Sequence, residues 1–223
     1  MRVLKGLALA AAAVALLASE ARATIVVDAF TVSQITQQVG VGHNSTTATG
    51  TGILGGTRTQ TVSLDTQPPF SVGVASSGSG VFSGSFTGGN SPVGGSYFDL
   101  GYTTTATDAA TGNTGFYFTA SSQGGSVLTI TANGSSTASV IVPAAPGFSN
   151  YFVSFGSFSN SSVFSALTSL DIRATFPNVT GSGPSITFSG PIIISAIPEP
   201  SIMALGSVAV VALGALRLRR KSS

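Results

Sequence analysis

Residues 126–142 read SVLTITANGSSTASVIV, and this stretch decides the expected fold. Two runs rich in Val, Ile and Thr, Ser126–Ala132 and Ser136–Val142, flank the dipeptide Asn133-Gly134. β-Branched residues favour extended backbone, and Asn-Gly is well suited to a tight turn between antiparallel strands. The stretch therefore predicts a β-hairpin.

Similar short runs, separated by Gly, Asn and Pro, recur along residues 24–196, and no long helical pattern occurs. In Leu170–Phe176 the apolar residues alternate with Asp171 and Arg173, which we expect to face solvent from a sheet covered on one side. Strands at this spacing indicate a sandwich or barrel. We expect eleven strands, at Thr24–Val32, Thr57–Leu64, Phe70–Ala75, Gly80–Thr87, Tyr97–Thr103, Gly115–Ala120, Ser126–Ala132, Ser136–Val142, Tyr151–Phe158, Leu170–Phe176 and Ser185–Ser195.

This strand pattern predicts an all-β body: a single jelly-roll-like β-sandwich over residues 24–196, long enough for a core of its own. Two strings, GILGGTR at 52–58 and FSALTSLDI at 164–172, resemble segments of galactose-binding-like and concanavalin-like jelly rolls. The resemblance implies a fold that often binds carbohydrate. The chain has no cysteine, so its stability must come from packing and sheet hydrogen bonds, and thiol chemistry is excluded.

The formal net charge of +2 comes from the two ends of the chain. Between residues 24 and 197 the only basic residues are Arg58 and Arg173, and five aspartates leave that part with a formal charge of −3. Nucleic-acid binding depends on clustered Lys and Arg near phosphates. The body has no such cluster, so we expect no nucleic-acid partner.

Residues 1–23 have the pattern of a secretory signal peptide. Two basic residues precede an apolar run over residues 6–17, and Ala21 and Ala23 provide the small residues of a cleavage site before Thr24. We therefore expect export, with signal peptidase as a processing partner. An uncleaved N-terminal anchor is the alternative, disfavoured because the apolar run is short.

The tail, residues 197–223, has three parts in a fixed order. Pro198, Glu199 and Pro200 come first, followed by an uncharged run over residues 201–216 that predicts one transmembrane helix of near-minimal length. Positive charge collects on the cytoplasmic side of such helices, which places the C-terminus inside. The run ends at a basic cluster expected to stop at the membrane, made of Arg217, Arg219, Arg220 and Lys221.

This arrangement of motif, apolar run and basic end resembles the PEP-CTERM sorting signal. The resemblance implies recognition by an exosortase, a membrane enzyme thought to cut near Pro-Glu-Pro and to release or re-anchor its substrate. It also implies an inner-membrane anchor before processing, a final place at the cell surface or in the extracellular matrix, and an association with exopolysaccharide and biofilm. An ordinary C-terminal anchor behind a Pro-rich linker is the alternative.

The residues expected of an active site or metal centre are sparse. His43 is the only histidine, lies in a polar stretch that we expect to be a solvated loop, and would have to act as the base of any Ser-His-Asp hydrolase. The body contains no glutamate, which disfavours the carboxylate pair of a glycosidase. We therefore assign no catalytic residue, metal or cofactor. A calcium site at Asp99 and Asp108 stays open, and the aspartates expected on solvent faces are Asp28, Asp65 and Asp171.

Aromatic residues in the predicted strands have two interpretations, a buried core or a platform for sugar rings. Strand spacing favours the core, and the absence of tryptophan weakens the sugar platform. The residues concerned are Tyr97, Phe98, Tyr102, Phe116, Tyr117 and Phe118. Four Asn-x-Ser/Thr sequons could accept glycans, at Asn44, Asn133, Asn160 and Asn178.

Taken together, these patterns favour an exported, non-enzymatic protein of the cell surface or extracellular matrix. Its expected partners are the two processing enzymes, the membrane and an exopolysaccharide. Two alternatives stay open: a carbohydrate-binding module of jelly-roll type, and a secreted hydrolase dependent on His43.

Overall fold

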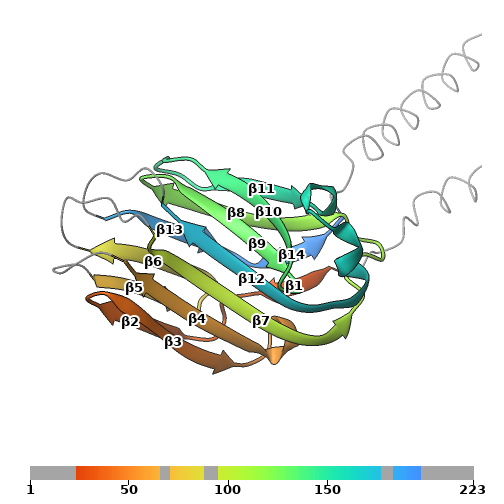
Figure 1. The fold of residues 1–223 in the computed structure, drawn as a ribbon, viewed down its shortest axis with the longest axis horizontal. Helices are drawn as coiled ribbons and strands as arrows, with labels where there is room; N and C mark the ends of the chain where they lie inside the picture. Colours follow the sequence, from red (N-terminus) through yellow and green to blue (C-terminus); the bar gives the residue numbers. More distant parts are fainter. Residues whose placement is uncertain (1–23, 66–70, 88–94, 177–182, 197–223) are drawn as a thin grey trace, which may run out of the picture.

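The computed structural model describes residues 24–65, 71–87, 95–176 and 183–196. These residues form fourteen strands and three short 3-10 helices, and the strands make two sheets that pack against each other (Figure 1). The predicted all-β, jelly-roll-like sandwich is confirmed for this body. Within the described ranges no helix is long and apolar enough to cross a membrane. Both predicted targeting segments lie outside those ranges and stay predictions.

Sheet A has eight strands in the order β1-β14-β8-β13-β6-β5-β2, with β11 on the other side of β8. β13 and β14 lie end to end along β8 and pair with its two halves. The single strand predicted over Ser185–Ser195 is therefore wrong, because Gly190, at a φ of 79°, and Pro191 interrupt it. The strands of sheet A are β1 (Ile25–Asp28), β2 (Gln34–Val39), β5 (Ser71–Ser76), β6 (Val81–Thr87), β8 (Gly115–Gln123), β11 (Ser149–Ser154), β13 (Ser185–Ser189) and β14 (Ile192–Ser195).

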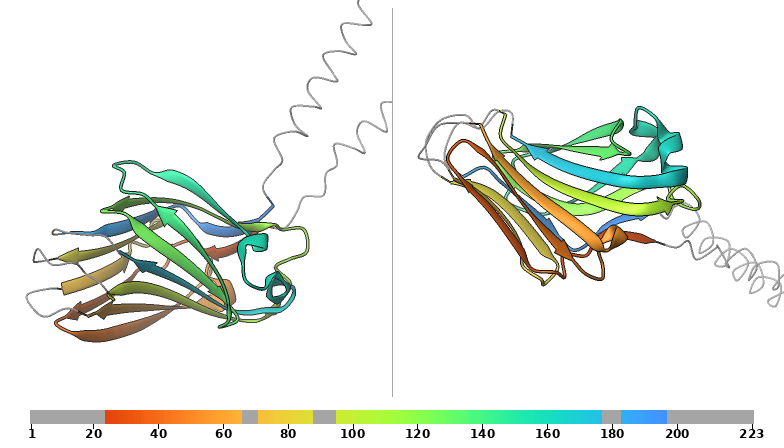
Figure 2. Two further views of the ribbon diagram at one scale, coloured as in Figure 1. Left: turned by 45° about the horizontal axis from the view of Figure 1, so that its top comes forward. Right: turned by 60° about the horizontal axis from the view of Figure 1, so that its bottom comes forward.

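Sheet B has six antiparallel strands in the order β10-β9-β12-β7-β4-β3. Figure 2 shows the two layers from other sides, with the 3-10 helices η2 (Phe155–Ser157) and η3 (Ser161–Ala166) together at one end. A third, η1 (Leu54–Gly56), precedes β4. The strands of sheet B are β3 (Gly42–Thr49), β4 (Thr57–Leu64), β7 (Tyr97–Thr107), β9 (Ser126–Ala132), β10 (Ser136–Val142) and β12 (Leu167–Thr175).

The hairpin predicted at residues 126–142 is confirmed as β9 and β10 with their predicted bounds. Asn133 and Gly134 have φ values of 50° and 69°, which suits the left-handed residues of a tight turn. The Asn133 side chain also accepts hydrogen bonds from the Thr168 and Ser169 amides and donates to the Ala166 carbonyl. The side-chain amide of this predicted sequon is therefore engaged in fixing the hairpin to β12.

β2 and β3, each at one edge of its sheet, were not predicted. Their sequences, QITQQV and GHNSTTAT, lack regular apolar alternation because polar side chains connect these strands. Gln34 donates to the Thr46 carbonyl at 2.8 Å, and Asn44 donates to the Gln37 carbonyl at 2.7 Å. His43 lies in β3 and is exposed, so the predicted loop is wrong although the predicted exposure is correct.

The segment predicted as one strand over Tyr151–Phe158 changes direction after β11. The Ser154 hydroxyl accepts a hydrogen bond from the Gly156 amide and begins η2. Phe155 then stacks on Phe164 at a centroid distance of 4.0 Å. Aromatic packing thus replaces the expected strand end by a helical turn.

The core lies between the sheets and is dominated by phenylalanine. Four of the six aromatic residues singled out by the sequence are buried there, as the core interpretation predicts: Phe98, Tyr102, Phe116 and Phe118. Packing is tight enough to require glycine at position 84, where a Cβ would lie 2.6 Å from the Phe98 ring. The other two aromatic residues, Tyr97 and Tyr117, lie on the outer faces of sheets B and A.

Candidate functional site

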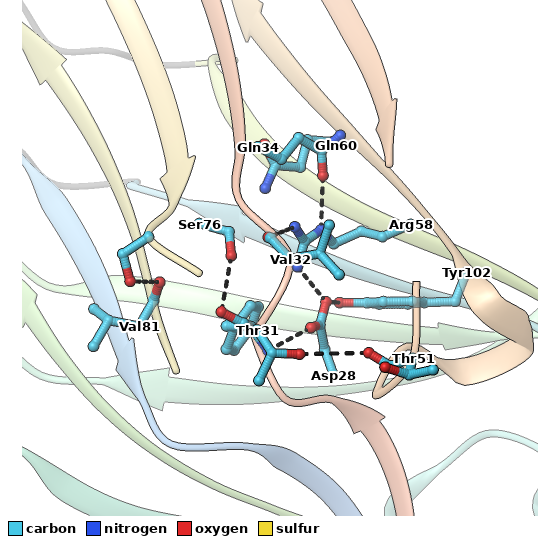
Figure 3. Close-up of polar contacts among 12 residues, drawn as sticks. Asp28, Thr31, Val32, Gln34, Thr51, Arg58, Gln60, Ser76, Val81 and Tyr102 are labelled. Atoms are coloured by element: carbon cyan, nitrogen blue, oxygen red, sulfur yellow. Dashed lines mark hydrogen bonds and ion pairs between the residues drawn. The ribbon is translucent and has the colours of Figure 1, made fainter. Parts of the chain in front are cut away.

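Each of the two arginines in the described body belongs to a separate polar cluster. The first cluster is buried between the sheets (Figure 3). Arg58 donates to Asp28 Oδ2 at 2.8 Å, to Gln34 Oε1 at 2.8 Å and to the Val32 carbonyl at 2.9 Å. Both charged side chains have an exposed fraction of 0%.

Both oxygens of Asp28 have protein partners. Oδ1 accepts from the Phe30 amide at 2.7 Å, and Oδ2 accepts from the Tyr102 hydroxyl at 2.9 Å as well as from Arg58. Burial, and secondly the Asp28 charge, raise the pKa of Tyr102 well above its ordinary value, so its hydroxyl keeps its proton. We assign this cluster a role in stability, because its groups are inaccessible and mutually satisfied.

The prediction that Asp28 faces solvent is wrong. The alternation expected along Thr24–Val32 stops because β1 ends at Asp28 and its register shifts there. Phe30 then adopts a φ of 52°, outside extended geometry. The change of direction turns the carboxylate toward Arg58 instead of water.

The second cluster lies on the outer face of sheet B, where β7 and β12 pair. Arg173 is opposite Asp99 in the ladder, and Asp171 is opposite Gly101. Arg173 donates to Asp99 Oδ2 from Nη2 at 2.7 Å and from Nε at 3.2 Å. The outward orientation predicted for Asp171 and Arg173 is therefore confirmed.

Tyr97 supports the guanidinium group of this cluster. The Arg173 Cζ lies 4.0 Å from the Tyr97 ring centroid, in the range of a cation–π contact. The Arg173 side chain is 44% exposed, whereas the Asp99 side chain is 9% exposed. The guanidinium therefore has one side fixed by the protein and another side open to solvent.

Asp99 and Asp171 form a carboxyl pair beside the arginine. Burial, followed by the hydrogen bond and charge of Asp99, raises the pKa of Asp171 to about 8, against the opposing charge of Arg173. Asp99 Oδ1 is buried, and within the described residues no protein N–H or hydroxyl group donates to it. At neutral pH the proton kept by Asp171 is the available donor beside this buried oxygen.

Hydroxyl-bearing side chains flank the cluster on both sides. Ser45 and Thr61 form a hydrogen-bonded cross-strand pair at 2.8 Å, and Thr129 and Ser139 form another at 3.0 Å. In the centre Gly101 carries no side chain, and a Cβ there would meet its nearest neighbour, Asp171 Oδ2, at 3.8 Å. The face thus combines a charged centre with neutral hydroxyl groups around a small gap.

The other candidate residues of the sequence are not brought to this face. Asp108 lies beyond the far end of β7, where it accepts from the Thr111 hydroxyl and amide, and these bonds lower its pKa. Asp65 follows β4 and is exposed. Among the described residues no three His, Cys, Asp or Glu side chains are grouped to hold a metal ion. The proposed calcium pair of Asp99 and Asp108 therefore does not assemble.

The Asp99 and Asp171 carboxyls can be compared with the acid pair of a glycosidase. Retaining enzymes separate their two carboxyl groups by about 5 Å and inverting enzymes by more, to admit the sugar or water. Asp99 and Asp171 are diagonal neighbours across the pair of β7 and β12, and Asp99 contributes to the raised pKa of Asp171. This arrangement can bind hydroxyl groups, and we assign it no catalytic role.

No protein-family model and no curated protein matches the chain. Among solved structures, the family 11 carbohydrate-binding module of the cellulosomal cellulase Lic26A-Cel5E of Clostridium thermocellum is similar, with 12% identity and a TM-score of 0.40 over 80% of this chain and 97% of that one. A mutant of a family 29 carbohydrate-binding module gives 9% identity and a TM-score of 0.37 over 76% and 99%. The agarase AgWH50C gives 14% identity and a TM-score of 0.39 over 60% of this chain and 25% of that one. Similarities at this level do not assign a ligand to this chain.

Proposed function

We propose that this protein is an exported carbohydrate-binding protein and that the outer face of sheet B is its binding face. The observation that carries the proposal is the half-exposed guanidinium of Arg173 beside the buried Asp99 Oδ1, which lacks a donor other than the Asp171 carboxyl. A sugar offers adjacent hydroxyl groups that both donate and accept. One hydroxyl can accept from Arg173 and donate to the carboxyl pair.

The electrostatic balance of the face favours a neutral sugar over an acidic one. Arg173 and Asp99 neutralise each other, and Asp171 keeps its proton at neutral pH. The only other arginine or lysine between residues 24 and 197 is Arg58, which is buried and cannot attract a polyanion. The surrounding serine and threonine hydroxyls supply additional neutral hydrogen-bonding groups.

We retain the proposal that the protein is sorted by an exosortase to the cell surface or matrix. Its support is the sequence pattern of Pro198, Glu199 and Pro200 with the apolar run and basic end behind it. A carbohydrate-binding domain delivered to this place would contact exopolysaccharide directly. Mass spectrometry of the protein from native cells tests the sorting: we expect a C-terminus near Pro198, and an intact tail at Ser223 contradicts it.

Glycan-array binding by the full-length chain in mild detergent tests the binding face. We expect Arg173→Ala to weaken binding about tenfold, the usual range for a hydrogen bond to a charged group. Tyr97→Ala should weaken it less, because that ring positions the guanidinium. Thr47→Ala, at the edge of the same sheet, is the control. Undiminished binding by Arg173→Ala would exclude this face.

A further inference from the structure

The outer face of sheet A carries a row of apolar side chains that the sandwich core does not use. Phe152 of β11 pairs with Tyr117 of β8, Tyr117 with Ile193 of β14, and Ile193 with Val26 of β1. Phe152 lies over Gly115, where a Cβ would be 2.7 Å from the ring. Because Gly115 has no side chain, the Phe152 ring can pack directly against the sheet next to Tyr117.

From this row, β8 continues with neutral polar side chains on the same face. Thr119 donates to the Asn150 side chain at 2.8 Å. Ser121 and Gln123 follow at the alternating outward positions, and within the described residues their side chains form no hydrogen bond. Six residue-to-residue steps of about 3.3 Å make the line from Tyr117 to Gln123 about 20 Å long.

The line ends in a hollow of about 460 Å³, lined by Ser121, Gln123, Ser185 and residues 144–146. The segment forming its wall is fixed to the sheet. Ala144 bridges to Ser122, and the Ala145 amide donates to the Ser122 carbonyl at 3.1 Å. The hollow is therefore a preformed feature of the fold.

No charged side chain faces outward on sheet A. Asp28 is the only charged residue in its strands, and it points into the core. An anionic polymer or an anionic lipid surface gains nothing electrostatically here. A membrane surface would also not match the end of this face that is lined by hydroxyl and amide groups. Rings at one end and uncharged hydrogen-bonding groups along the rest suit a neutral oligosaccharide.

We propose that this line and hollow, the β8 track, form a second carbohydrate-binding site for a neutral polysaccharide. Because sheets A and B face opposite directions, the protein then binds two polysaccharide chains at once. The β8 track stands on its own residues, whereas the cross-linking of two chains rests on the proposed function of sheet B as well. Such bivalent binding raises avidity without new contacts and connects separate chains of a matrix.

The experiment uses the full-length chain in mild detergent, with hydroxyethylcellulose, galactomannan and dextran as neutral probes and alginate as an acidic one. Affinity electrophoresis measures binding, and light scattering of the polymer solution measures cross-linking. We expect retardation by at least one neutral probe, and about tenfold weaker binding of that probe to the β8 track in Tyr117→Ala with Phe152→Ala. The light scattering that reports cross-linking should also be lost in this double variant. Ser85→Ala, on the same face outside the track, is the control.

The variants separate the two sites. Cross-linking lost in both the Tyr117/Phe152 double variant and Arg173→Ala, while each still binds the probe, supports the β8 track. If retardation and scattering are unchanged in the double variant, the β8 track is not a binding site. That result does not count against the proposed site on sheet B. Binding lost in the double variant but unchanged in Arg173→Ala supports the track and removes the sheet B site. Tyr117-dependent binding to phosphatidylcholine vesicles, or Tyr117-dependent dimerisation without any glycan binding, overturns it.

Discussion

The two arginine–aspartate pairs of this protein have nearly equal ion-pair distances but differ in their exposure to solvent. Arg58 and Asp28 are 2.8 Å apart with no exposure, and both Asp28 oxygens and all three side-chain nitrogens of Arg58 have a hydrogen-bond partner. Arg173 and Asp99 are 2.7 Å apart, but the arginine is 44% exposed and one aspartate oxygen lacks a fixed donor. The first pair connects parts of the fold, and the second leaves hydrogen-bonding capacity for a ligand.

This difference shows that an ion-pair distance does not indicate a function. A buried charge must be compensated within the protein, since its desolvation is costly. A charge at the surface is compensated by water, which a ligand can replace. The comparison therefore predicts large stability effects at the first pair and binding effects at the second.

The largest effect is expected for Arg58→Ala. Removing one partner leaves the Asp28 charge buried, so the free energy of unfolding should fall by about 3–5 kcal/mol. Urea unfolding followed by circular dichroism measures the change. Asp28→Ala combined with Arg58→Ala should cost less than the sum of the single changes. A loss below 1 kcal/mol for Arg58→Ala would contradict the structural role.

Two glycines allow a similar comparison of packing, one in the core and one on the outer face of sheet B. In Gly84→Ala the new Cβ meets the Phe98 ring at 2.6 Å in the core, and we expect a loss of about 1–3 kcal/mol. In Gly101→Ala the nearest atom is 3.8 Å away on the open face, and stability should barely change. Thermal unfolding of both variants provides the measurement. Equal losses would show that the sheet B face is as closely packed as the core.

A smaller loss is expected for Arg173→Ala. Half-exposed ion pairs contribute little, so the free energy of unfolding should fall by about 1 kcal/mol or less, although glycan binding decreases. Urea unfolding and the array experiment are done on the same preparation. A stability loss as large as that of Arg58→Ala would mean that the second pair is also structural.

The smallest effect at acidic pH is expected for Asp171→Asn. The folded-state pKa of about 8 lies above the ordinary value of 3.8, so the folded protein binds the proton more tightly than the unfolded chain. Stability contributed by this proton is complete below pH 4 and is lost as pH rises to about 8. Asp171→Asn should change the free energy of unfolding little at pH 4, and it should make the decline in stability between pH 4 and pH 8 shallower. An unchanged pH profile of unfolding between 4 and 9 contradicts the raised pKa of Asp171.

Much of the strand pattern could be predicted because local sequence encodes it. β4, β9 and β10 have the predicted bounds, since alternation and the Asn-Gly turn are properties of adjacent residues. β2 and β3 were missed because their polar side chains bond to each other across the edge. The candidate site was found only in part: Asp171 and Arg173 were expected outside, but their meeting with Asp99 and Tyr97 depends on a strand seventy residues away.

The sequence by itself determined an all-β body, its lack of disulfides and the scarcity of charge, and it predicts targeting signals at both ends, which stay predictions. These depend on composition and on neighbours along the chain. The tertiary structure decided which charges were buried and which were left open, because strand register pairs Arg173 with Asp99 and the bend after β1 turns Asp28 inward. Register and bends follow from how two whole sheets share one core, which no short stretch of sequence contains.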